Sequence, residues 1–242
     1  MPGRKGRGGK GSKGGGSVSD RRSLATRVKT AKRRKTSSTR WLQRQLNDPY
    51  VAEAKRLGYR SRAAFKLLEL DDRFKLLAPG AAVADLGCAP GGWCQVAHEQ
   101  VGPSGHVVGI DIQEVEPMAG VTLVQGDIME DEALAALVDA LGGKADAVLS
   151  DMAAKATGHK QTDHLRTMAL AEAAYDFAAR ALKPGGAFVA KVLQGGTEKD
   201  LLDLLKRDFE KVAHAKPPSS RKGSSEMYVV ATGFRGEGAQ AL

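Results

Sequence analysis

The sequence predicts an α/β protein with a mostly parallel sheet of seven strands, one antiparallel edge strand, and helices on both faces. Two observations support this class. Short β-rich segments alternate with helical segments from about residue 82 onward, and a glycine-rich turn follows the first of these strands. Such alternation is typical of a parallel sheet whose ligands bind at the carboxyl ends of the strands. The predicted strands cover residues 82–86, 106–111, 121–124, 146–150, 187–192, 210–214 and 227–232.

Helices are predicted between these strands and ahead of the first one. Asp48 and Pro49 suit the N-cap and the first turn of one helix, and Ser61 is predicted to cap a second helix, whose apolar stripe reaches Leu77. The last two strands are joined by a Pro- and Ser-rich loop, residues 216–225, without a helix, which predicts an antiparallel pair. The helices between strands are predicted at residues 92–101, 130–141, 162–182 and 197–207.

Positive charge is concentrated at the N-terminus. Residues 1–40 contain fourteen Lys and Arg against one acid, a net +13, whereas the whole chain carries +9. We therefore expect residues 1–40 to be a basic, disordered tail suited to a polyanion, although a merely solvated tail fits the composition too. We expect residues 41–233 to form the folded domain and residues 234–242 a short flexible C-terminal tail.

The remaining composition predicts a cytoplasmic protein. The chain has two cysteines, Cys88 and Cys94, too few for a disulfide framework, and we expect both to pack under the glycine-rich turn. No apolar run approaches the roughly 18 residues that a membrane helix needs, and no hydrophobic signal segment follows the basic N-terminus. We expect no membrane partner and, by default, a monomer.

The segment Asp85–Trp93 is the strongest indication of a ligand site. Gly87, Gly91 and Gly92 allow the backbone to turn with positive φ and to approach a ligand closely. Their spacing departs from the G-x-G-x-x-G pattern of dinucleotide-binding folds, which disfavours a pyrophosphate ligand. An acid at the strand end, Asp85, favours a ligand with cationic groups instead.

Two further acids follow the next strands. Asp111 lies where α/β folds hold a ribose, and Asp127 follows the third strand, although Asp85 or Asp127 taken singly could simply cap a helix or close a turn. S-adenosylmethionine carries an ammonium, a sulfonium and a ribose but no phosphate. The sequence D-L-G-x-x-P-G-G-W resembles motif I of class I methyltransferases, in which the corresponding acids bind ribose and adenine. The resemblance assigns the cofactor to Asp85, Gly87, Gly91, Gly92, Trp93, Asp111, Asp127 and Asp151.

The sequence also narrows the choice of methyl acceptor. A pyrimidine carbon requires a nucleophilic cysteine in the substrate pocket, but both cysteines lie in or beside the cofactor loop. The D/N-P-P-Y/F pattern of adenine amino-methylation is replaced by Ser-Asp-Met-Ala-Ala at residues 150–154. A hydroxyl acceptor remains, whose oxygen must be oriented or deprotonated. Lys191, at the end of an apolar strand, suits that role, although a lysine there can also extend its ammonium to solvent.

Five segments, taken together and in order, are similar to the FtsJ-like RNA 2′-O-ribose methyltransferases across about residues 41–233. The resemblance implies a class I S-adenosylmethionine-dependent methyltransferase (Rossmann-like) fold and a catalytic Lys–Asp–Lys–Glu tetrad of Lys66, Asp151, Lys191 and Glu226. One departure is Lys155, where the family's Asp-Met-Ala-Pro-Asn has asparagine. The five segments are residues 61–67, 85–93, 150–152, 189–195 and 216–226.

The resemblance also implies the substrate: a uridine of the large-subunit (23S) ribosomal RNA, in an assembled or assembling 50S subunit. Methylation of transfer RNA, or a non-catalytic RNA-binding assembly factor, are the alternatives. Lys191 is either a neutral base or a charged group that orients the hydroxyl. No metal is expected, because the pair His159 and His164 is typical of an exposed helix start. RNA contacts are predicted for the tail and for Arg60, Arg62, Arg221 and Lys222, which could also be ordinary solvated cations.

Overall fold

The computed structural model describes residues 36–155, 157–194 and 199–236. The chain divides into two compact units, the first ending at Asp48 and the second starting at Pro49. The described part of the first unit is one helix, α1 (Thr36–Leu46), which begins ahead of the predicted domain boundary at residue 41. The rest of the predicted basic tail and residues 237–242 lie outside the described residues, so both tails stay predictions.

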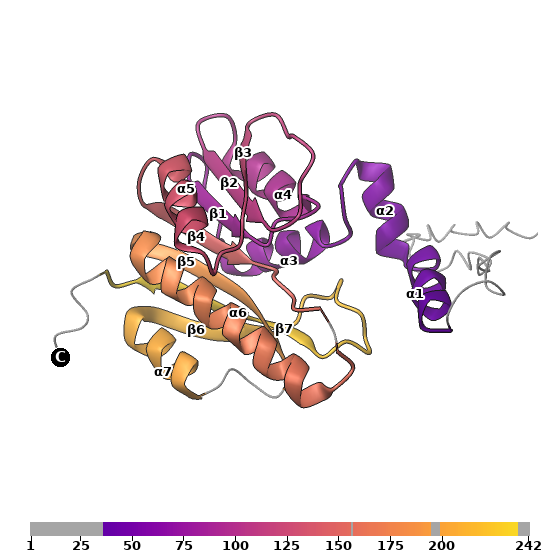
Figure 1. The fold of residues 1–242 in the computed structure, drawn as a ribbon. Helices are drawn as coiled ribbons and strands as arrows, with labels where there is room; N and C mark the ends of the chain where they lie inside the picture. The colour runs from indigo at the N-terminus through magenta and orange to yellow at the C-terminus, as the bar shows by residue number, and fades with distance from the viewer. Residues whose placement is uncertain (1–35, 156, 195–198, 237–242) are drawn as a thin grey trace, which may run out of the picture. The chain divides into compact units, whose positions relative to one another are not determined.

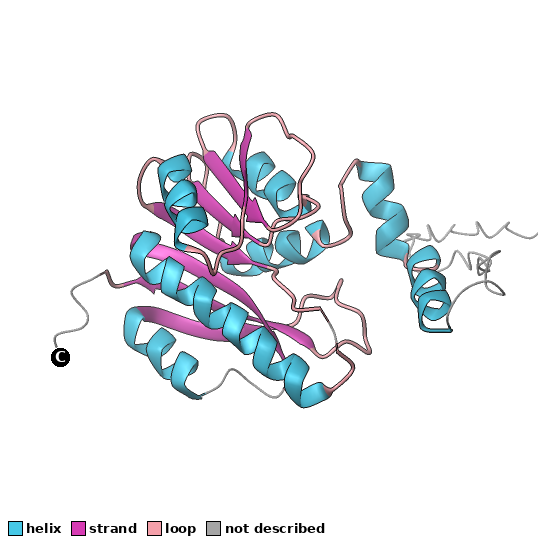
Figure 2. Ribbon diagram, viewed as in Figure 1, coloured by secondary structure: helices cyan, strands magenta, loops and turns pink. Residues whose placement is uncertain are grey.

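The second unit is built on a seven-stranded sheet (Figures 1 and 2) with the strand order β3-β2-β1-β4-β5-β7-β6. The strands from β3 to β5 are parallel to their neighbours, whereas β7 is antiparallel to both β5 and β6. The antiparallel strand thus lies one position in from the edge, because β7 returns between β5 and β6. The strands are β1 (Ala82–Leu86), β2 (His106–Asp111), β3 (Val121–Gln125), β4 (Ala145–Ser150), β5 (Leu182–Leu193), β6 (Phe209–Ala215) and β7 (Glu226–Phe234).

Helices cover both faces of this sheet, as the alternation predicted. Alternate strand residues enter separate cores: Val83 packs with α3 and α4, whereas Ala84 packs with α5, α6 and α7. This period of two is what a sheet buried on both faces requires. The helices of this unit are α2 (Pro49–Leu57), α3 (Ala64–Phe74), α4 (Gly92–Val101), α5 (Asp131–Leu141), α6 (Lys160–Ala181) and α7 (Lys199–Asp208).

Two local predictions need correction. Ser61 does not cap the helix before β1, because α3 begins at Ala64 with Ala63 as an N-cap that makes no side-chain hydrogen bond. The strand predicted at 187–192 starts earlier, at Leu182, which pairs with Ala145 before a register shift. In the part of the chain that the structure describes, no helix is long and apolar enough to cross a membrane.

Candidate active site

Two pockets share one edge of the sheet, at the carboxyl ends of β1 and β4. The chain leaves β1 toward β2 on one side, while β4 lies on the other, so the strand order reverses here and opens a crevice of the kind that binds ligands. The larger pocket measures about 550 Å³ and the smaller about 150 Å³. Both are lined by Gly87, Ala89 and Asp151.

Glycines bring the backbone close to both pockets. Gly87 has φ +76°, and a Cβ there would lie 2.4 Å from Cγ of Met152, which also lines the larger pocket. Gly92 begins α4, and a Cβ there would lie 2.4 Å from Ser61 Oγ. A side chain at either position would therefore collide with a residue that lines one of the pockets.

Two residues that line the smaller pocket each have a buried polar atom with no partner in the described part of the chain. Ser61 Oγ and Asp85 Oδ1 make no hydrogen bond among the described residues, and both residues line this pocket. Burial raises the pKa of Asp85 to about 7, and the nearby charges of Asp151 and Asp111 add to that effect. One pocket is thus lined by residues with an unpaired hydroxyl and an unpaired carboxyl oxygen, which is costly unless a ligand pairs with them.

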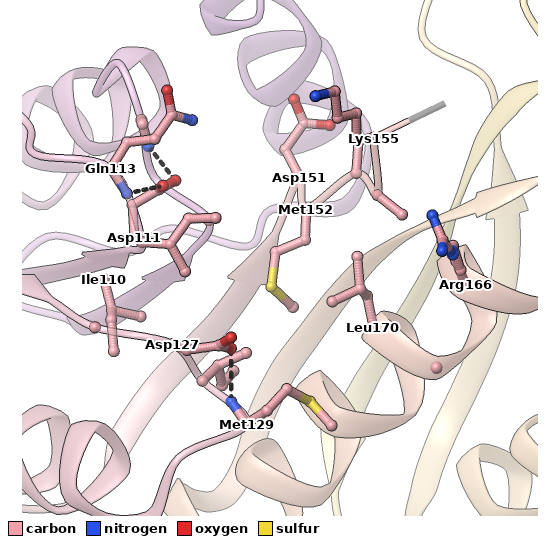
Figure 3. A pocket seen from close by; sticks show the side chains of 18 residues that line it. Ile110, Asp111, Gln113, Asp127, Met129, Asp151, Met152, Lys155, Arg166 and Leu170 are labelled. Carbon is pink, nitrogen blue, oxygen red and sulfur yellow. Dashed lines mark hydrogen bonds between the residues drawn. The ribbon is translucent and has the colours of Figure 1, made fainter. Parts of the chain in front are cut away.

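The larger pocket is bordered by the two acids that follow β2 and β3 (Figure 3). Asp111 Oδ2 accepts a hydrogen bond from Ala89 N at 2.9 Å, and its Oδ1 accepts one from Gln113 N at 2.8 Å. Asp127 Oδ1 accepts one from Met129 N at 3.0 Å. Backbone amides therefore fix both carboxylates, while each oxygen can still accept another donor.

The four residues of the predicted tetrad come together at the shared edge of the pockets. Lys191 Nζ lies 2.9 Å from Asp151 Oδ1 and donates to the Asp151 carbonyl oxygen at 2.7 Å. Lys66 Nζ lies 3.3 Å from Glu226 Oε2 and 3.6 Å from Asp151 Oδ1. Both lysines are buried, with 6% of Lys66 and 7% of Lys191 exposed. Buried lysines are rare unless paired, so two in one cluster distinguish this site from a solvated surface.

Strand register explains how residues so far apart in the chain meet. The parallel pair Ser150–Ala190 places Asp151 beside Lys191, and the antiparallel pair Lys191–Tyr228 places β7 on the other side. Glu226 lies two residues before Tyr228 and on the same face of β7. Lys66 is supplied by α3, which packs on this face of the sheet.

Tyr228 is a member of this cluster that the sequence analysis did not single out. Its hydroxyl donates to Asp151 Oδ1 at 2.5 Å and accepts from Lys66 Nζ at 2.9 Å. Its ring packs against Trp93, with the ring centroids 5.6 Å apart. One sequence feature could have indicated Tyr228: it lies two residues after an acid in an otherwise apolar strand.

The lysines keep both carboxylates ionised. Although burial opposes ionisation, the charges of Lys191 and then Lys66 hold the pKa of Asp151 below its ordinary value. For Glu226, burial is likewise outweighed by Lys66 and then Lys191, and its pKa is also lowered. Burial raises the pKa of Tyr228 well above its usual range, which keeps it a phenol that can donate to Asp151.

Other predicted residues have partners inside the chain. The Trp93 indole donates to the Ala63 carbonyl at 2.8 Å, and both residues line the smaller pocket. The Arg60 guanidinium donates to the carbonyls of Glu116 at 2.6 Å and Pro117 at 2.8 Å. These bonds give Arg60 a role in holding the loop between β2 and β3.

Arg62 and the 216–225 loop are also connected. Arg62 donates to the carbonyl of Ser219, whose N–H and hydroxyl both donate to Glu69 Oε2. Arg221 and Lys222 lie on this loop, just before Glu226, and Lys222 is exposed. RNA contact by these residues and by Arg60 stays a prediction. So does the absence of a metal, although no group of three or more potential ligands gathers within the described residues.

Comparison with known proteins identifies the family. Residues 59–234 match the model of the FtsJ-like methyltransferases. The chain therefore belongs to this family and is a methyltransferase, which confirms the predicted resemblance and fold. Over 228 residues it is 63% identical to a ribosomal RNA large subunit methyltransferase E of Paramagnetospirillum magneticum, covering 92% of this chain and 93% of that one.

Two further relatives agree with this assignment. A ribosomal RNA large subunit methyltransferase E of Sphingopyxis alaskensis is 61% identical over 230 residues, covering 95% of this chain and 98% of the relative. A crystal structure of a provisionally named ribosomal RNA methyltransferase from Plasmodium falciparum has a TM-score of 0.65 and 33% identity. It covers 74% of this chain and 100% of its own.

Proposed function

We propose that this protein transfers a methyl group from S-adenosylmethionine to the 2′-hydroxyl of a uridine in large-subunit (23S) ribosomal RNA, within the 50S subunit. The observation that carries the proposal is the buried cluster of Lys66, Asp151, Lys191 and Glu226 beside the two pockets. Relatives named ribosomal RNA large subunit methyltransferase E, at 61–63% identity, support the choice of substrate. One chain carries the whole cluster, so a monomer suffices, and a ribosomal RNA substrate would place the enzyme in the cytoplasm.

The pockets fit S-adenosylmethionine in four places. Asp85 Oδ1, without a partner among the described residues, suits its ammonium, and the Ser61 hydroxyl together with the N-terminus of α4 suits its carboxylate. Asp111 can accept the ribose hydroxyls with the lone pairs that the loop amides leave. Asp127 and the apolar wall around Ile110 then flank the space for the adenine.

Lys191 is the residue that we assign to the acceptor hydroxyl. When bound, S-adenosylmethionine supplies the methyl group that the ribose oxygen takes from its sulfonium. Lys191 directs two N–H groups at two oxygens of Asp151, which leaves the third position on its nitrogen for the acceptor hydroxyl. From there it either orients the ribose oxygen as an ammonium or takes its proton as an amine. Lys66 and Tyr228 hold Asp151 in place during this transfer.

The RNA is proposed to meet the enzyme on the side of the 216–225 loop. Arg221 and Lys222 precede Glu226 there, and the net +13 of residues 1–40 adds a sequence-independent attraction for phosphates. Arg62 shapes this side through the Ser219 carbonyl that it holds, and Arg60, which holds the loop between β2 and β3, is proposed to contact the RNA from there.

Transfer of radiolabelled methyl groups tests the proposal. The full chain is incubated with labelled S-adenosylmethionine and, separately, 50S subunits lacking the modification, protein-free 23S RNA, and bulk transfer RNA, with Lys191→Ala as the inactive control. We expect label in the 50S subunit at the 2′-oxygen of one uridine, located by nuclease mapping. Label in transfer RNA alone would favour the alternative substrate, and no label in any RNA, with the donor bound, would favour a non-catalytic factor.

A further inference from the structure

The carboxyl group of Asp85 has two unlike oxygens. Asp85 is fully buried at the end of β1. Its Oδ2 accepts a hydrogen bond from Cys94 Sγ at 3.2 Å. Its Oδ1 has no partner within the described residues, and Asp85 lines the smaller pocket. The thiol therefore anchors one oxygen and leaves the other for a ligand.

The surroundings of Cys94 are built to hold its sulfur at this place. Asp85 pairs in register with Gly109 on β2. A Cβ on Gly109 would lie 2.7 Å from Cys94 Sγ and 2.8 Å from Cys88 Sγ, so the glycine makes room for both sulfurs. Cys94 has 0% of its surface exposed. Because the interior is close-packed, the sulfur has little freedom to move away from the carboxyl.

We propose that Cys94 is a positioning residue for donor binding: its thiol holds Asp85 Oδ2, so that Oδ1 faces the smaller pocket and receives the ammonium of S-adenosylmethionine. This inference rests on the proposed function, since it concerns the same donor. Nothing in the family match or in the names of the relatives assigns a role to this cysteine.

The charges around Asp85 make this role measurable. The pKa of Asp85 is raised to about 7, chiefly by burial and in part by Asp151 after β4 and Asp111 at the end of β2, while the S–H and N–H of Cys94 on α4 oppose the rise. Cys88 faces the sulfur of Cys94 rather than the carboxyl. Only the ionised carboxylate of Asp85 pairs with an ammonium. The affinity for S-adenosylmethionine should therefore increase as the pH rises through about 7. Losing the thiol donor should move this increase to higher pH.

Calorimetric binding of S-adenosylhomocysteine tests the inference, because this product keeps the ammonium but has no methyl group to transfer. Affinities of full-length wild type, Cys94→Ala, Cys94→Ser and Cys88→Ala are measured from about pH 5.5 to about pH 8.5, around the shifted carboxyl. We expect Cys94→Ala to raise the midpoint by about half a pH unit or more, since a weak donor to a charged group is lost. Cys94→Ser, whose hydroxyl is a stronger donor than a thiol, should lower the midpoint below the wild-type value, and Cys88→Ala should leave it unchanged.

Methylthioadenosine, which lacks the amino-acid portion, is the matched ligand control and should bind without this pH dependence. An equal loss of affinity at every pH in Cys94→Ala would show a packing role only and overturn the proposal, as would the same pH dependence with methylthioadenosine. If Cys94→Ala does not fold, an unchanged midpoint in Cys94→Ser overturns it. Failure of the wild type to bind either S-adenosylmethionine or its product would instead refute the proposed function.

Discussion

The proposed S-adenosylmethionine (donor) side and the proposed RNA (acceptor) side of the candidate active site are built in different ways. The donor side comes largely from one stretch of chain, residues 85–129, in which backbone amides such as Ala89 N hold the carboxylate of Asp111. On the acceptor side, side chains hold one another. Lys66 and Glu226 form an ion pair although 160 positions separate them in the chain.

This difference implies that the two sides can fail separately. A substitution in the acceptor cluster removes ion pairs between side chains but leaves the loops after β1 and β2 in place, because those loops are fixed by hydrogen bonds of their own. A substitution at Asp111 releases loop amides and leaves Lys191 and Asp151 in contact. A substitution on one side should therefore change either the affinity for S-adenosylmethionine or the rate of methyl transfer, and leave the other close to wild type.

The largest effect on the methyl-transfer rate alone is expected at Lys191. Lys191→Arg keeps a positive charge but scarcely releases a proton and has a different donor geometry. We expect the single-turnover rate of methyl transfer to fall by about 10²- to 10⁴-fold, the range typical of a lost general base, with the affinity for S-adenosylhomocysteine unchanged. Lys183→Arg, on the same strand but paired with Asp146, is the control. A variant that keeps nearly the full rate would exclude both a base and an orienting role.

The reverse separation is expected at Asp111. In Asp111→Asn the amide can accept from only one of the two backbone donors that its carboxylate now serves, Ala89 N and Gln113 N. We expect the affinity for S-adenosylmethionine to fall by about 10- to 100-fold, because a hydrogen bond to a charged group is lost. The rate at saturating donor should stay close to wild type. Asp72→Asn, on the exposed surface of α3, controls for the charge change; an equal loss of affinity there would contradict the assignment.

The same contrast decides what the sequence alone could predict. The donor side was open to prediction because strand, glycine turn and acid follow one another locally, as at Asp85 and Asp111. The acceptor side was open only in part: Lys191 stands out at the end of an apolar strand, whereas Lys66 by itself looks like an ordinary helical lysine and is assigned through the family resemblance. Its burial depends on the register of β5 and β7, which no local pattern specifies.

Ser61 and Tyr228, which the sequence analysis predicted wrongly or did not single out, both owe their contacts to residues distant in the chain. Ser61 was predicted as a helix cap, yet its hydroxyl faces the N-terminus of α4, a contact made only in the folded chain. Tyr228 was not singled out because a tyrosine in an apolar strand is typical of a core position. Its hydroxyl becomes informative only when Asp151 and Lys66 are placed around it.

A smaller effect is expected from Tyr228→Phe, which keeps the ring against Trp93 and removes one donor to Asp151. We expect roughly a tenfold slower transfer, about the value of one hydrogen bond to a charged group. The pKa of Asp151 is held below its ordinary value partly by this donor. Its removal should raise that pKa and move the acid limb of the rate–pH profile to higher pH. Tyr175→Phe, at the buried Asp208, should leave that limb in place.

Deleting residues 1–35 should change neither side of the site and therefore has the smallest effect on the rate at saturating RNA. These residues lie ahead of α1 and carry most of the positive charge of residues 1–40. If that charge binds phosphates, the slope of log affinity against log salt becomes shallower by about 0.7 to 0.9 for every phosphate that the shortened protein no longer neutralises. We expect weaker RNA binding, a shallower slope and unchanged donor affinity, measured by filter binding at several salt concentrations. An unchanged slope would show that the charges guiding RNA to the acceptor cluster lie on the folded domain, and that Arg221 and Lys222 should be tested next.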